Sequence, residues 1–199
     1  MASQIDIVNM ALVKLGQNTI TSLTENSVAA QSMSAMYDLE RKALLRQYRW
    51  SFSISRAQLA ALTDTPAFQY SYQYQLPTDC LQVIRLFEGE PDPNWPDFDQ
   101  FPERAYKVEG RKILTDYEAP VYLVYVSDVD ESGNFDSAFV AALADRLAYV
   151  TCNRITQSTT LKKSIKDDFR TSISFAIRSN AIELPSERQA DTSWSLCRL

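Results

Sequence analysis

The nine residues 68–76, FQYSYQYQL, decide the fold class of this chain. Aromatic and aliphatic side chains alternate there with Gln and Ser, which is the period-two pattern of a β-strand with one buried face. Helical patterns lie on both sides of this strand, in residues 1–56 and 134–182. The sequence therefore predicts an α+β fold, with a bundle of about four helices, an antiparallel β domain (57–133) inserted between the second and third helices, and an extended C-terminal tail (183–199).

The inserted region contains further strand patterns. Residues 81–87 and 121–126 are apolar on both faces, and the second of these should be central in its sheet. Residues 106–108 and 112–114 flank the tight-turn sequence Glu109-Gly110-Arg111, which predicts a hairpin. Short links between successive strands predict an antiparallel meander. No basic residues interleave with the aromatic alternation of 68–76, so it favours a core strand over a base-stacking platform.

Four helices follow from apolar positions spaced by three and four residues together with capping signals. They are expected at about 3–15 with Ser3 as N-cap, at 27–48 capped by Asn26 or Ser27, and at about 136–154 capped by Asp136 or Asn134. The fourth begins at Thr159 or Thr160 and ends near 180. Its apolar stripe steps by four residues: Leu161, Ile165, Phe169, Ile173 and Ile177. Trp50 and Phe52 are expected to dock the end of the second helix on the core.

Composition excludes several kinds of active site. The 199 residues include no histidine, so a Ser-His-Asp triad and an imidazole zinc site are absent. The four glycines are too far apart for a dinucleotide or phosphate loop, and three distant cysteines indicate neither disulfides nor a metal site. The acids Asp128, Asp130 and Glu131 are expected to form a turn and cap a helix. No catalytic, metal or cofactor residues are predicted, and the chain is expected not to be an enzyme.

The charge balance bears on partners and location. The net charge of −5 gives no overall excess of cations, which argues against sequence-specific DNA binding but suits a surface that DNA passes without sticking. The first residues lack a signal-peptide pattern, and no apolar run approaches the roughly 20 residues of a membrane helix. The sequence thus predicts a cytosolic protein without a membrane partner.

A basic group ends the second predicted helix: Arg41, Lys42, Arg46 and Arg49. Cations at a helix C-terminus complement the helix dipole, so a solvated helix end is one interpretation. The alternative is a contact patch for an acidic neighbour or for passing phosphates, at a channel or a subunit interface.

An acidic, proline-rich loop at 88–102 interrupts the β region. It contains no Lys or Arg but carries three large aromatic residues, Trp95, Phe98 and Phe101. Proline prevents regular strand pairing there. Either the rings fold back on the sheet, or they mark a binding tip for a neighbouring copy or another component.

The last residues lack helical periodicity, yet they carry isolated apolar anchors. These are Trp194, Leu196 and Leu199, accompanied by Arg188 and Arg198. Such a composition suits a segment that orders on a partner, the alternative being a frayed terminus.

Several motifs, in this order, resemble one known family. They are IVNMALVKLG at 7–16, ITSL at 20–23, LLR at 44–46, YRWSF at 48–52, YQLPTDCL at 74–81, FVAALADRLA at 139–148, and Ser193-Trp194 with Arg198 near the end. Together they cover nearly the whole chain. The sequence resembles the tail tubular protein A family, the head-to-tail adaptors of tailed bacteriophages.

The resemblance implies a structural virion protein at the head–tail junction, assembled in the host cytoplasm. Copies would form a homo-oligomeric ring, commonly of twelve, and line part of the DNA channel. The C-terminal anchors would bind the portal protein. The opposite side would receive the next tail component, a nozzle or a tail tube or terminator, with the aromatic loop as a candidate contact. A different interpretation is a small cytosolic module that recruits one partner through the aromatic loop and the tail.

Overall fold

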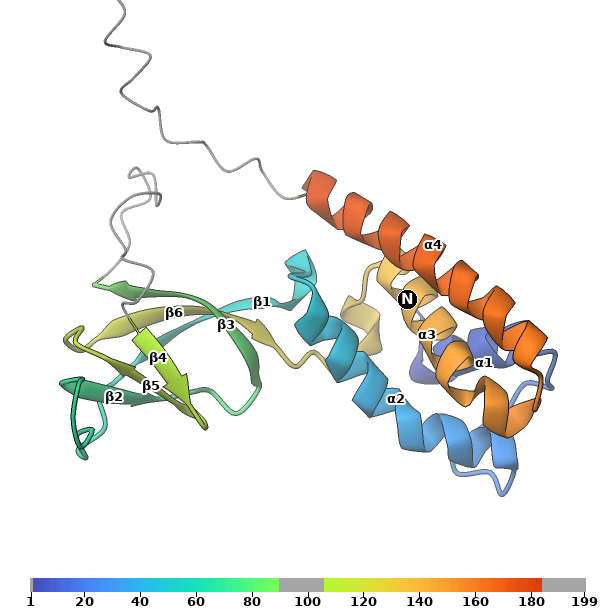
Figure 1. The fold of residues 1–199 in the computed structure, drawn as a ribbon, viewed down its shortest axis with the longest axis horizontal. Helices are drawn as coiled ribbons and strands as arrows, with labels where there is room; N and C mark the ends of the chain where they lie inside the picture. The colour runs from blue at the N-terminus through green and yellow to red at the C-terminus, as the bar shows by residue number, and fades with distance from the viewer. Residues whose placement is uncertain (1, 90–105, 184–199) are drawn as a thin grey trace, which may run out of the picture. The chain divides into compact units, whose positions relative to one another are not determined.

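The computed structural model describes residues 2–89 and 106–183. The fold is α+β, with four helices and two three-stranded antiparallel sheets, as predicted (Figure 1). The described residues divide into two compact units. One is helical and comprises 2–54 and 126–183; the other contains the sheets and comprises 55–89 and 106–125.

The helices of the first unit begin where local capping signals predict. The helix α1 (Gln4–Lys14) starts after Ser3, whose hydroxyl accepts a hydrogen bond from the Asp6 backbone N–H while the Asp6 carboxylate accepts one from the Ser3 N–H. Such a capping box satisfies two otherwise unpaired donors. Ser27 caps α2 (Val28–Gln47), and Asp136 caps α3 (Ser137–Ile155). The last helix, α4 (Thr159–Glu183), extends beyond its predicted end.

The centre of the helical unit is α3. It packs against α1, α2 and α4, whereas α2 and α4 make almost no contact with each other. Figure 1 shows α3 between α2 and α4. Three large α3 side chains, Phe139, Leu143 and Leu147, are completely buried. Its alanines let neighbouring helices approach closely, and the hydrophobic effect on this central helix therefore holds the unit together.

Charged contacts also tie α3 to its neighbours. Lys14 of α1 pairs with the buried Asp145. The Arg146 Nε lies 2.7 Å from the Glu40 Oε2 of α2, and the guanidinium carbon of Arg146 lies 5.5 Å from the ring centroid of Phe169 on α4. Adjacent α3 residues thus bind all three other helices, which fixes their positions along α3.

The turn after α2 docks on the core through Trp50, as predicted. Trp50 is completely buried, its indole N–H donates to the Leu44 carbonyl at 3.0 Å, and its ring meets Phe139 edge-on with centroids 5.0 Å apart. Phe52, in the short 3₁₀ helix η1 (Ser51–Ser53), stacks on Trp50 and also contacts Phe139. These aromatic contacts anchor the turn between α2 and β1 on α3.

The strands form two sheets, in the orders β1-β6-β3 and β2-β5-β4. Their bounds are β1 (Ile54–Leu59), β2 (Tyr72–Gln75), β3 (Cys80–Glu88), β4 (Tyr106–Glu109), β5 (Lys112–Thr115) and β6 (Val121–Ser127); a 3₁₀ turn, η2 (Ser132–Asn134), follows β6. As predicted, β6 is central in its sheet, and β4 and β5 form an antiparallel hairpin around Gly110, whose φ is 60°. The predicted meander is wrong, because β4 and β5 are the only sequential strands that pair within these sheets.

The deciding stretch 68–76 is only partly a strand. Gln69 has a φ of 76°, in the left-handed region that extended strands do not use, so regular pairing begins at Tyr72. Phe68, expected on the buried face, is 81% exposed. Tyr74 and Leu76 are buried as expected, in a core cluster that draws side chains from both sheets, including Ile113 and Leu123. The β unit therefore has a hydrophobic core of its own.

Candidate functional site

The basic group at the end of α2 is the predicted site that the structure describes. Arg41 lies inside the helix and is buried, with 3% of its side chain exposed. Lys42 is 48% exposed, and Arg46 and Arg49 are exposed. The four cations therefore do not form one surface: Arg41 points inward and the other three remain outside.

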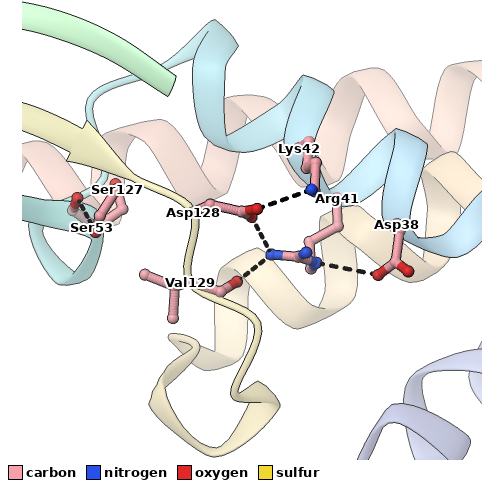
Figure 2. Close-up of polar contacts among 7 residues, drawn as sticks. All are labelled: Asp38, Arg41, Lys42, Ser53, Ser127, Asp128 and Val129. Carbon is pink, nitrogen blue, oxygen red and sulfur yellow. Dashed lines mark hydrogen bonds and ion pairs between the residues drawn. The ribbon is translucent and has the colours of Figure 1, made fainter. Parts of the chain in front are cut away.

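The Arg41 guanidinium is held by groups of its own chain (Figure 2). Its Nη1 donates to the Asp128 Oδ1 at 2.6 Å and also to the Val129 carbonyl, and its Nε lies 3.6 Å from the Asp38 Oδ1. Because an unpaired buried cation is very costly, these acceptors explain how Arg41 is tolerated in the core. Arg41 acts here as a structural residue that binds the segment after β6 to α2.

Asp128 is shared between two cations. Its second oxygen, Oδ2, lies 2.8 Å from the Lys42 Nζ. Partial burial alone would raise the pKa of Asp128, but the hydrogen bonds from Lys42 and Arg41 outweigh it and hold that pKa below its ordinary value of 3.8. The carboxylate is therefore charged at neutral pH and neutralises much of the basic group.

This role corrects the interpretation of Asp128 as a turn-forming or capping residue. The cap of α3 is Asp136, whose carboxylate accepts from the Ala138 N–H at 3.2 Å. Asp128 lies 87 residues from Arg41 along the chain. No local pattern marks so distant a pair, and only the fold brings the two together.

A second contact lies beside this cluster. The Ser127 hydroxyl donates to the Ser53 carbonyl at 2.9 Å, and both residues are buried (Figure 2). The two chain segments that leave and re-enter the helical unit are thus joined by a hydrogen bond. Together with Asp128, this contact fixes the start of the connection from β6 to α3.

Of the four residues in this basic group, Arg46 and Arg49 form no ion pair with a described residue. The backbone at Arg49 is nevertheless well held. Asn180 of α4 donates to the Arg49 carbonyl at 2.9 Å and accepts from the Ser51 N–H at 2.8 Å. The Arg49 guanidinium therefore extends from a backbone that is hydrogen-bonded to α4, and its chemistry suits binding of carboxylates or phosphates.

The other predicted site residues lie outside the described residues. These are the loop aromatics Trp95, Phe98 and Phe101, and the tail residues Arg188, Trp194, Leu196, Leu199 and Arg198. The structure therefore does not bear on the expected loop and tail contacts.

Within residues 2–89 and 106–183, no cluster of three or more Cys, Asp or Glu residues is arranged to hold a metal ion. Cys80 and Cys152 are both buried, and burial raises the pKa of the Cys80 thiol. A shallow, open depression on the surface is lined by residues of α1, including Asp6, Asn9 and Lys14, so it does not bring together groups from several elements. None of the helices in the described ranges is long and apolar enough to span a membrane.

Neither the comparison with protein-family models nor that with curated proteins gives a match to this chain. The function of the chain is therefore inferred from its own residues.

What the described site offers is electrostatic binding. Arg46, in the last turn of α2, and Arg49, just after the helix, are exposed and form no ion pair within the described part of the chain, while Asp128 compensates part of the charge of Arg41 and Lys42. The exposed guanidinium groups are chemically suited to weak, reversible contacts with carboxylates or phosphates.

Proposed function

We propose that this chain is a ring-forming head-to-tail adaptor of a tailed bacteriophage, which joins the portal to the tail and lines part of the DNA channel. One observation carries the proposal. The motifs that resemble the tail tubular protein A family coincide with core residues of successive elements. Ile7, Leu12, Trp50, Tyr74 and Phe139 are each completely buried. The resemblance therefore lies in residues that determine a fold, and in their order, which a short surface motif would not explain.

The charge distribution supports passage of DNA without tight binding. The chain has a net charge of −5, and the Asp128 carboxylate compensates the basic residues Arg41 and Lys42. A channel that held DNA through many uncompensated cations would bind the phosphates and slow their movement.

The portal contact is proposed for the C-terminal residues. Trp194, Leu196 and Leu199 would be the apolar anchors, with Arg188 and Arg198 paired to portal carboxylates. Large aromatic residues dominate the binding energy of most interfaces, so Trp194 should contribute most. The aromatic loop residues Trp95, Phe98 and Phe101 are proposed to contact the next tail component or a neighbouring copy.

Portal binding by the purified chain tests the function. The full chain, a chain lacking residues 185–199, and Trp194→Ala are each mixed with portal rings from the same virus, and binding is measured by co-sedimentation. We expect the deletion to abolish binding and Trp194→Ala to weaken it by about 2 kcal/mol or more. Undiminished binding after the deletion would refute the tail contact. If the full chain does not bind portal and is absent from purified virions, the adaptor function is wrong, and the one-partner module becomes the better interpretation.

A further inference from the structure

Two helices of the helical unit expose large apolar side chains on their outer faces. Leu39 of α2 is 63% exposed, and Phe175 of α4 is 67% exposed. Ile182 extends the outer face of α4, with 85% exposure. Singly exposed apolar residues are common, but an aromatic residue and an isoleucine two turns apart on one helix face indicate a contact surface.

These faces do not belong to the bundle core. The core face of α4 contains Ile165, Ile173 and Ala176, all buried on the rest of the helical unit. Phe175 follows Ile173 by two residues, about 200° around the helix axis, so it points away from that core. The helix α4 therefore has two apolar faces, and its own unit covers one of them.

Each outer face also carries an unpaired charge seven residues from its apolar side chain. Arg46 follows Leu39 by seven residues, and Asp168 precedes Phe175 by seven. Seven residues correspond to about 10.5 Å along a helix and return to nearly the same face. Neither Arg46 nor Asp168 forms an ion pair with a described residue.

The seven-residue spacing on both helices distinguishes antiparallel from parallel packing of α2 in one copy against α4 in another. When α2 and α4 of different copies run antiparallel with Leu39 on Phe175, Arg46 lies at the level of Asp168. When they run parallel, Arg46 meets the apolar Ile182, and Asp168 is left without a cation. Charge complementarity therefore selects the antiparallel arrangement.

We propose that the outer face of α2, formed by Leu39 and Arg46, binds the outer face of α4, formed by Asp168 and Phe175, on a second copy of this chain. This inference rests on the proposed ring and names its subunit contact. The two faces differ and belong to helices on different sides of α3 (Figure 1). The contact is thus heterologous, so each copy offers a free face to the next and assembly continues until rotation closes a ring.

Charge reversal in the full chain tests the contact. Arg46→Asp, Asp168→Arg and the double variant are compared with the unmodified chain by native mass spectrometry and sedimentation velocity, alone at high concentration and on portal rings. We expect each single reversal to weaken association of copies about 10-fold, because it replaces attraction by repulsion at every contact. The double variant should recover most of this loss, because the two charges are exchanged. Lys163→Asp, an exposed reversal elsewhere on α4, is the matched control and should leave association unchanged.

A cross-linking measurement does not depend on the strength of association. With Cys197 changed to Ser, Leu39→Cys and Phe175→Cys in the same chain should give a ladder of disulfide-linked copies under oxidation on portal rings. Rings that form normally but show neither the ladder nor the rescue by the double variant would overturn the α2–α4 contact and leave the adaptor function standing. A chain that forms no oligomer either alone or on portal would overturn both.

Discussion

At the scale of single residues, the most consequential contact is the one between Arg41 and Asp128. A buried guanidinium needs several acceptors, and Asp128 supplies the only carboxylate within normal hydrogen-bond distance of Arg41 among the described residues. The remaining acceptor groups are the Val129 carbonyl and the more distant Asp38 carboxylate. The stability of the helical unit should therefore depend strongly on the negative charge of Asp128.

Asp128→Asn should destabilise the fold by about 2 kcal/mol, because it leaves the buried Arg41 with an uncompensated charge. The free energy of unfolding, measured in urea, checks this. Asp130→Asn is the matched control, since Asp130 is exposed and pairs with no described residue, and its effect should be within about 0.5 kcal/mol. Equal stabilities of the two variants would contradict the structural role of Asp128.

The same pair predicts a pH dependence. The pKa of Asp128 is lower in the folded chain than its ordinary value of 3.8, so the ionised carboxylate favours the folded state. Its contribution is complete above the pKa of the unfolded chain and is lost as the pH falls through the lower folded pKa. The stability difference between the unmodified chain and Asp128→Asn should be constant above about pH 5 and shrink below about pH 4. A difference that grew on acidification would contradict this assignment.

At the scale of secondary-structure elements, what the sequence predicts well is local. Helix starts at Ser3, Ser27 and Asp136 follow from side chains that bind backbone groups three residues away or fewer, so a short window of sequence contains the whole signal. The stripe of α4 and the burial of Trp50 are similarly local. The order of strands does not follow from local signals, because the pairing of β6 with both β1 and β3 joins segments far apart in the sequence.

The aromatic alternation shows where a local pattern fails. Nothing in the period-two spacing of residues 68–76 reveals that the backbone turns at Gln69, so the pattern predicts a longer strand than the structure has. The candidate site was limited in the same way. The sequence located the basic residues, but their division into a buried Arg41 and exposed Arg46 and Arg49 depends on Asp128, which is distant in sequence.

The end of α3 offers a stabilising substitution. Gln157 follows the cap residue Thr156 with a φ of 52°, a left-handed conformation in which a Cβ atom is unfavourable. Glycine is the usual residue at this position after a helix. Gln157→Gly should raise the free energy of unfolding by about 0.5–1 kcal/mol, measured in urea. A loss of stability would mean that the Gln157 side chain makes a compensating contact.

The turn after α2 should be sensitive to truncation. Trp50→Ala removes a completely buried indole and its contacts with Phe139 and the Leu44 carbonyl, so we expect a loss of about 3–5 kcal/mol. Phe68→Ala is a control for removal of a large aromatic side chain, because Phe68 is 81% exposed and should tolerate it. Thermal unfolding followed by circular dichroism separates the two outcomes.

At the scale of the whole molecule, each unit has its own hydrophobic core, and the C-terminal residues lack the periodicity that would add them to either. Removal of residues 185–199 should therefore change the free energy of unfolding by no more than about 0.5 kcal/mol while it abolishes portal binding. Urea unfolding and co-sedimentation on the same preparation measure both effects. A large loss of stability would show that these residues belong to a core, and the loss of portal binding would then have a different cause.

The hydrogen bond between Ser127 and Ser53 has a consequence for how such a chain could diversify. It holds the two ends of the inserted segment, residues 55–125, beside each other in the helical unit. A short linker that connects Ser53 directly to Ser127 should therefore leave the packing of Trp50 and α3 unchanged. An inserted domain of different size and specificity could then replace residues 55–125 without a change in the helices, provided that its own two ends lie equally close together.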